Sequence, residues 1–158
     1  MIRKRILLVA ACLVLAGAAL AGDDEDQPRG LPTLDWQGHR DATERARAEG
    51  KPLMLYFAAP SCDRCRRMEK ETFADGDVVR YLNEHFALAE VNADHLPALA
   101  AKYGVNGLPT LVFLDPEGAR LTRFDGFIKA DDLKPLMTFI VSGDYSWTDY
   151  ETWREHHK

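Results

Sequence analysis

Short apolar runs alternate with amphipathic stretches along most of the chain. The run LMLYFA at Leu53–Ala58 is continuously apolar, which is typical of a strand buried on both faces of a sheet. Comparable patterns predict further strands at 87–92, 110–114 and 119–124, and helices at 39–49, 62–73, 75–86, 96–103 and 131–141. Because strands alternate with helices before a terminal hairpin, this order predicts an α/β sheet layered between helices.

The N-terminal segment does not follow this pattern. It has three basic residues, an apolar run from Ile6 to Leu20 and small residues ending at Ala21, which is the layout of a secretory signal. The alternative is an uncleaved membrane anchor, but this apolar run is shorter than the roughly 17–25 residues that span a bilayer. We therefore expect four segments: a signal peptide at 1–21, an acidic flexible linker at 22–33, a folded domain at 34–143 and an aromatic tail at 144–158.

Composition narrows the class of protein. The 158 residues carry a formal net charge of −5, so the chain lacks the basic surface of a nucleic-acid-binding protein. The length predicts one domain, and the 28% of charged residues excludes a multi-span membrane protein. Cleavage of the signal peptide would remove three of the 20 basic residues. The 17 that remain and the 25 acidic residues give the mature chain a net charge of −8. Cleavage would also remove Cys12 and leave Cys62 and Cys65, which we expect to form a pair in an oxidising compartment.

The motif Cys62-Asp63-Arg64-Cys65 fits the chemistry of thiol–disulfide exchange. A cysteine at the start of a helix faces free backbone amides and the positive end of the helix dipole, which stabilise the attacking thiolate. A second cysteine one turn later can close a disulfide after the first has formed a mixed disulfide with a substrate. The spacing alone leaves two alternatives: half of a zinc site, for which no second ligand pair has suitable spacing, and a purely structural disulfide.

The sequence around this motif resembles the thioredoxin fold family. The resemblance depends on a buried strand, a CxxC motif at a helix start and Leu108-Pro109-Thr110 before another strand, and it covers roughly residues 36–141. One branch of the family is especially similar: secreted thioredoxin-like proteins and the C-terminal periplasmic domain of DsbD-type electron transporters. The segments that resemble this branch are GKPL at 50–53, EKETF at 69–73 and GLPT at 107–110. The resemblance implies a central mixed sheet of about four to five strands flanked by helices.

The resemblance also implies roles for individual residues. Cys62 would be the nucleophile and Cys65 the resolving cysteine. Leu108 and Pro109 would lie where a substrate backbone docks, with Pro109 following a cis peptide bond, a conformation that is essentially confined to proline.

Two positions depart from the thioredoxin pattern. Thioredoxin has a tryptophan immediately before the first cysteine and a buried aspartate six residues before it, whereas this chain has Ser61 and Tyr56 there. Tyr56 is either a core residue or a proton-handling group, and its apolar neighbours favour the core. Glu69, one turn beyond Cys65, is the remaining acid that could act as a proton relay, and the alternative is a solvated helix residue.

Together these features predict an exported, periplasmic thiol–disulfide oxidoreductase that reduces protein disulfides through Cys62 and Cys65. Its partners would be disulfide-bearing client proteins and a thiol protein or membrane electron donor. No nucleotide-binding motif is present, so we expect no cofactor, and we expect a monomer. The alternative function is a non-catalytic binding or assembly module with a structural disulfide. We expect the aromatic tail to fold back as a terminal helix rather than to bind a partner.

Overall fold

Four strands form one mixed sheet in the part of the chain that the computed structural model describes, residues 33–157. The strands are β1 (Leu53–Ala58), β2 (Ala87–Asn92), β3 (Thr110–Leu114) and β4 (Arg120–Asp125), in the spatial order β2-β1-β3-β4. β2 is parallel to β1, whereas β1–β3 and β3–β4 are antiparallel pairs. The expected signal peptide and nearly all of the expected linker lie outside the described residues.

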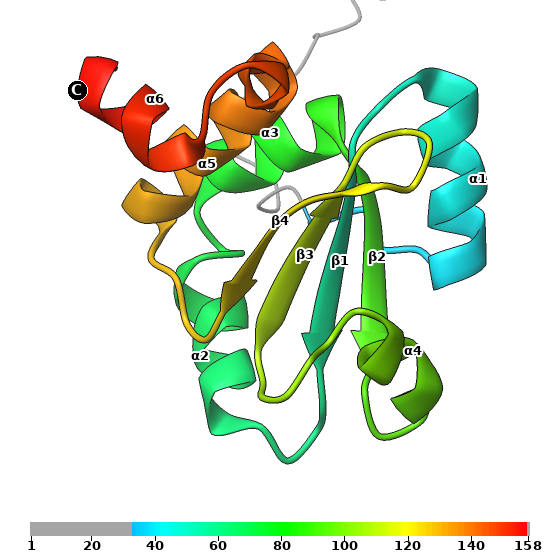
Figure 1. Ribbon diagram of the computed structural model, residues 1–158. Coiled ribbons are helices and arrows are strands. Elements are labelled where there is room, and N and C mark those ends of the chain that lie inside the picture. Colours follow the sequence, from blue (N-terminus) through cyan, green and yellow to red (C-terminus); the bar gives the residue numbers. More distant parts are fainter. Residues whose placement is uncertain (1–32, 158) are drawn as a thin grey trace, which may run out of the picture.

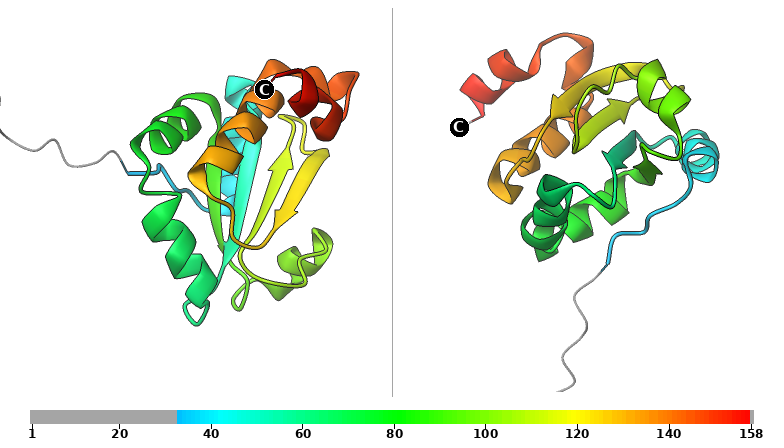
Figure 2. Two further views of the ribbon diagram at one scale, coloured as in Figure 1. Left: turned by 90° about the vertical axis from the view of Figure 1, so that its left-hand side faces the viewer. Right: turned by 90° about the horizontal axis from the view of Figure 1, so that it is seen from below.

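Helices cover both faces of this sheet (Figures 1 and 2). They are α1 (His39–Glu49), α2 (Asp63–Glu71), α3 (Gly76–His85), α4 (Pro97–Lys102), α5 (Ala130–Ser142) and α6 (Tyr150–His156), with a short 3₁₀ turn at Asp144–Ser146. The parallel pairing of β1 with β2 needs a crossover connection, which α2 and α3 supply. None of the helices between residues 33 and 157 is long and apolar enough to cross a bilayer. The predicted α/β class and mixed sheet are confirmed.

β1 separates two hydrophobic cores, because the side chains of a strand alternate between the two faces of a sheet. Met54 and Tyr56 pack into the core that α2, α3 and α5 cover, whereas Leu55 and Phe57 pack into the core under α1 and α4. These four residues are each at most 1% exposed. Burial on both faces is the physical reason why this strand is continuously apolar.

The C-terminal residues fold back onto α5. Trp153 in α6 is 5% exposed, and its ring centroid lies 5.5 Å from that of Phe139 and 6.3 Å from that of Tyr150. The indole N–H of Trp153 donates a hydrogen bond to the Asp144 carboxylate at 2.6 Å. Trp147, in contrast, is 73% exposed. The expected terminal helix is present, and it buries one of the two tryptophans of the tail.

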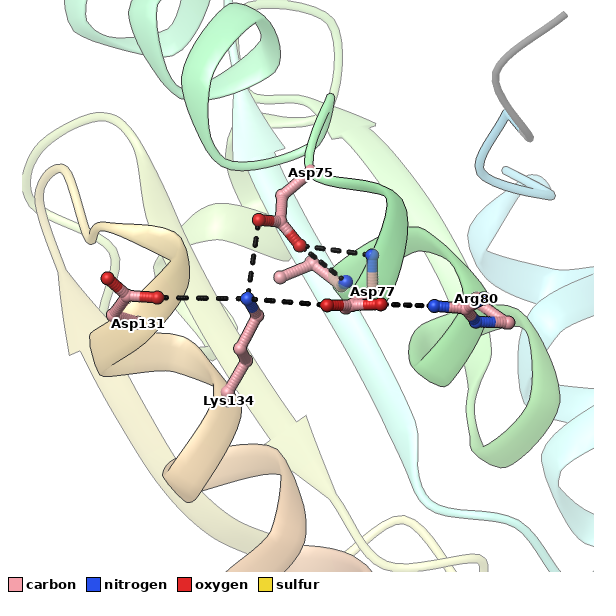
Figure 3. A network of polar contacts seen from close by, with 6 residues as sticks. Asp75, Asp77, Arg80, Asp131 and Lys134 are labelled. Atoms are coloured by element: carbon pink, nitrogen blue, oxygen red, sulfur yellow. Dashed lines mark hydrogen bonds and ion pairs between the residues drawn. The ribbon is translucent and has the colours of Figure 1, made fainter.

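Asp75 is the N-cap residue of α3, and its carboxylate connects this helix to α5 (Figure 3). Its carboxylate accepts hydrogen bonds from the amides of Asp77 at 3.1 Å and Val78 at 3.0 Å, and it lies 3.3 Å from the Lys134 ammonium. Lys134 also faces Asp131 at 3.7 Å. The hydrogen bond from the Val78 amide and the Lys134 charge hold the pKa of Asp75 below its ordinary value.

We expect Asp75→Ala to lower the free energy of unfolding by about 1–2 kcal/mol near neutral pH, because α3 loses its N-cap. Since the folded state lowers the pKa of Asp75, this stabilisation is complete above the ordinary carboxyl pKa of about 4 and disappears as the pH falls through the folded-state pKa. Urea unfolding of both proteins at neutral and acidic pH measures it. Asp131→Ala is the matched control, because the Asp131 side chain is 95% exposed. An equal loss of stability in both variants would contradict the capping role.

Candidate redox site

The backbone that follows β1 brings Cys62 to the N-terminus of α2. β1 ends at Ala58, and Cys62 is the N-cap residue of α2. The amide of Cys62 donates a hydrogen bond to the carbonyl of Ala59 at 3.0 Å, which closes a tight turn between strand and helix. Because the first amides of a helix have no partner within it, the start of α2 presents hydrogen-bond donors to the Cys62 side chain.

The two cysteines of the motif differ in exposure. Cys62 and Cys65 are joined by a disulfide, and their Cα atoms lie 5.2 Å apart. Cys65 is 1% exposed, whereas Cys62 is only partly buried. The amide of Cys65 donates a hydrogen bond to the Cys62 sulfur at 3.1 Å, a contact that favours a thiolate at Cys62 after reduction. An accessible sulfur beside a buried one suits an attacking and a resolving cysteine.

The loop before β3 lies at the same end of the sheet as this disulfide (Figure 1). Phe57, near the end of β1, pairs with Thr110, and Pro109 immediately precedes Thr110. The Leu108–Pro109 peptide bond is cis. Among the described residues, neither the amide nor the carbonyl of Leu108 has a backbone hydrogen-bond partner. This loop therefore presents unused backbone polar groups at the end of the sheet that holds Cys62.

Tyr56 connects β1 to α2 behind the disulfide. Its side chain is buried, and its hydroxyl lies 3.1 Å from Glu69 Oε1 and 3.3 Å from the carbonyl oxygen of Cys65. Burial, followed by the charge of Glu69, raises the pKa of Tyr56 far above its ordinary value, so the hydroxyl stays protonated and can donate to Glu69. The interpretation of Tyr56 as a core residue is confirmed, but it omits this hydrogen bond to Glu69.

Arg66 supports the loop before Cys62. Its guanidinium donates a hydrogen bond to the carbonyl of Pro60 at 2.7 Å and forms an ion pair with Asp63. Arg64 is exposed beside the disulfide. The motif therefore combines a loop fixed by Arg66 with an ion pair between Asp63 and Arg66 in the first turn of α2.

Comparison with known proteins identifies the family to which this chain belongs. Residues 39–140 match the thioredoxin-like domain. The chain belongs to the thioredoxin-like family. It is 35% identical over 138 residues to thiol:disulfide interchange protein DsbD of Yersinia pestis (strain Pestoides F), a match that covers 80% of this chain and 23% of that protein. Disulfide bond reductase DsbH of Chlamydia pneumoniae is 26% identical over 130 residues, which are 75% of this chain and 78% of that protein.

Solved structures agree with this assignment to the thioredoxin-like family. A thioredoxin from Thermus thermophilus matches with a TM-score of 0.63 and 29% identity, over 68% of this chain and 87% of that one. Family membership together with a Cys62–Cys65 disulfide at CxxC spacing makes this protein a thioredoxin-like thiol–disulfide oxidoreductase. The predicted family and enzyme class are confirmed.

The thioredoxin-like sequence pattern does not reveal Glu90. This residue lies in β2 directly opposite Tyr56 in the parallel pairing. Burial, followed by the charge of Glu69, raises the pKa of Glu90. The available signal was a single acid, Glu90, in the mostly apolar strand sequence ALAEVN. The residue opposite Glu90 depends on the strand register, which this sequence does not reveal. Within residues 33–157, no three His, Cys, Asp or Glu side chains come together as ligands for a metal ion.

Proposed function

We propose that this protein is exported to the periplasm and reduces the disulfides of client proteins. The observation that carries the proposal is the pairing of a partly exposed Cys62 sulfur, held by a helix amide, with a buried Cys65. The layout of residues 1–21 supports export. The reductive direction is supported by the similarity to a relative named disulfide bond reductase.

The reaction begins with both cysteines reduced. The Cys62 thiolate attacks one sulfur of a client disulfide, forms a mixed disulfide and releases the other client sulfur as a thiolate. Cys65 then loses its proton and attacks Cys62, which releases the second client sulfur and forms the Cys62–Cys65 disulfide. Two electrons pass from the protein to the client. A thiol protein or a membrane electron donor must then reduce the disulfide before another cycle.

Three further residues have roles in this proposal. Leu108 and Pro109 form the surface where an extended client backbone docks, because Leu108 has unused backbone polar groups at the end of the sheet that holds the disulfide. Glu69 accepts the proton that Cys65 releases, because it lies one helical turn beyond Cys65 and accepts a hydrogen bond from Tyr56, whose hydroxyl is also 3.3 Å from the Cys65 carbonyl oxygen. The protein acts as a monomer, and it uses neither a cofactor nor nucleic acid.

The reduction potential of the Cys62–Cys65 pair tests the direction of electron flow. We expect equilibration with dithiol redox buffers to give a value closer to about −270 mV, typical of a reductant, than to about −120 mV, typical of an oxidant. Trapping free thiols with a maleimide and weighing the products by mass spectrometry measures the reduced fraction. A Cys62→Ser/Cys65→Ser protein provides the unreactive reference. A potential near −120 mV would overturn the reductive direction and indicate an enzyme that introduces disulfides.

A further inference from the structure

β4 lies at the edge of the sheet, so one side of its backbone has no neighbouring strand (Figure 1). The amide of Gly126 donates a hydrogen bond to the carbonyl of Pro109 at 2.8 Å, directly beyond the last paired residues of β3 and β4. Because bonded and non-bonded pairs alternate along an antiparallel ladder, Phe124 bonds to β3, whereas Arg123 and Asp125 direct their backbone groups outward. Among the described residues, no other segment forms a backbone hydrogen bond with these outward groups.

A hollow of about 520 Å³ lies beside this free edge. Phe124 and Arg123 line it from β4, Leu136 lines it from α5 and Tyr150 from α6. The side chains of Phe124, Leu136 and Tyr150 all pack against the core that α5 covers, so the hollow is on that face of the sheet. A strand added to β4 would therefore place every second side chain over an apolar surface between β4 and the two C-terminal helices.

The charges around the hollow nearly balance. Its charged lining residues are Arg123, Lys129, Arg154, Asp132 and Glu151. Arg154 lies 2.7 Å from Glu151. Arg123 lies 2.9 Å from Asp125. In the part of the chain that the structure describes, this leaves one charge of each sign, on Lys129 and Asp132, without an ion pair. The hollow therefore suits an uncharged polypeptide segment better than a polyanion.

The free edge adjoins the loop that carries the cis-proline. Asp125 pairs with Thr110, which follows Pro109, and the Thr110 hydroxyl lies 3.1 Å from Asp125 Oδ1. A strand beyond β4 would be two strand spacings, or about 10 Å, from β3. About three extended residues cover that distance. A chain that docks at Pro109 can therefore continue along the outer side of β4.

We propose that the outer edge of β4 is a second docking surface, where an extended segment of the client adds as a strand and places apolar side chains over the hollow. This inference rests on the proposed function and names the class of client: proteins whose chain beside the reactive cysteine is extended and has free backbone groups. An exposed strand edge recognises such a segment through its backbone, and the hollow selects the alternate side chains. A folded client, whose backbone groups are already paired, lacks this second contact.

Peptide disulfides of different length test the proposal. One peptide has a small disulfide loop alone, and the others carry in addition a tail of alternating valine and threonine, before or after the loop. The tail has about eight residues, enough to reach the edge and lie along it. Stopped-flow measurement with the reduced protein gives the second-order rate constant for each peptide. One tailed peptide should react about tenfold faster than the loop alone, because two or more backbone hydrogen bonds form with β4.

Arg123→Pro removes one outward amide of β4. Proline is tolerated on an edge strand where the N–H faces away from the sheet, so the ladder with β3 is retained. The ratio of the two rate constants should fall by about fivefold or more. Arg123→Ala is the matched control, because it removes the same side-chain contacts with Gly104 and Asp125 but keeps the amide. It should keep the wild-type ratio. Urea unfolding checks that both variants are folded.

N-methylation of the tail tests the same contact without any change in the protein. Two tailed peptides are methylated on alternate amides, one at the odd positions and one at the even positions. Only one set of amides faces β4 in an added strand. One of these peptides should therefore lose the rate advantage of the tail and the other should keep it.

The outcomes separate this inference from the function on which it rests. Equal rates for loop and tailed peptides, equal effects of Arg123→Pro and Arg123→Ala, or equal effects of the two methylation patterns would each overturn the docking surface. A wild-type dimer in analytical ultracentrifugation that Arg123→Pro dissociates would overturn it too, since a second copy of β4 would then occupy the edge. Failure of the wild-type protein to reduce the loop peptide would instead overturn the proposed reductase function.

Discussion

Cys65→Ser is expected to leave Cys62 covalently attached to the proteins that it attacks. The variant retains the accessible sulfur at the start of α2, but it lacks the buried sulfur that would release a bound client. Mixed disulfides should therefore accumulate until most of the variant is in adducts, and catalytic turnover should fall to background. Non-reducing electrophoresis of a periplasmic extract, followed by mass spectrometry of the adduct bands, measures this result.

Cys62→Ser is the matched control for this trapping experiment. It removes the partly exposed sulfur and keeps the buried one, so it should give no adducts. The double-serine protein sets the background. If Cys65→Ser yielded no more adducts than the double-serine protein, the exchange mechanism would be wrong. The alternative function, a binding module with a structural disulfide, would then be favoured.

Phe113→Ala is expected to cost about 3–5 kcal/mol of unfolding free energy. Phe113 is 0% exposed in β3, and its ring meets that of Phe86 edge to face with the centroids 6.0 Å apart. Removing the ring leaves a cavity between the sheet and α3, and the loss is a large part of the stability of a typical domain. Urea unfolding followed by circular dichroism measures the change.

Trp147→Ala provides the comparison for this loss of stability. It removes a still larger aromatic side chain, but one that is 73% exposed, so it should change the unfolding free energy by less than about 0.5 kcal/mol. Equal losses in the two variants would show that the core between the sheet and α3 does not determine stability.

Local sequence patterns predicted the helices and strands of this fold well, because each one depends mainly on residues that are close together along the chain. The apolar run Leu53–Ala58 reflects burial on both faces, and the N-cap position of Cys62 follows from the chain break at Pro60. Helix and strand ends differ from the predictions by a few residues at most. The cysteine pair was also evident from its spacing, since two cysteines one helical turn apart can be bonded.

Contacts between distant segments could not be predicted in this way. The hydrogen bond from Tyr56 to Glu69 joins residues 13 positions apart on different elements. The position of Glu90 depends on the register of β2 against β1, which is established across two intervening helices. The indole of Trp153 meets Asp144 only because the tail turns back at Gly143. Each contact results from three-dimensional packing, so periodicity along the chain does not reveal it.

The side chains of β1 alternate between two cores, so the register of this strand also determines whether the contacts of the redox site form. A slip of one residue in the pairing of β1 would exchange the two faces of the strand. Tyr56 would then point toward α1 and α4, and Glu69 would lose its hydroxyl partner. A chain with this error would bury an unpaired phenol and would lack the hydrogen bond from Tyr56 to Glu69, on which the proposed proton path depends. Under the proposed mechanism, correct strand pairing and a complete redox site therefore form together, and we expect a molecule misfolded in this way to be less active.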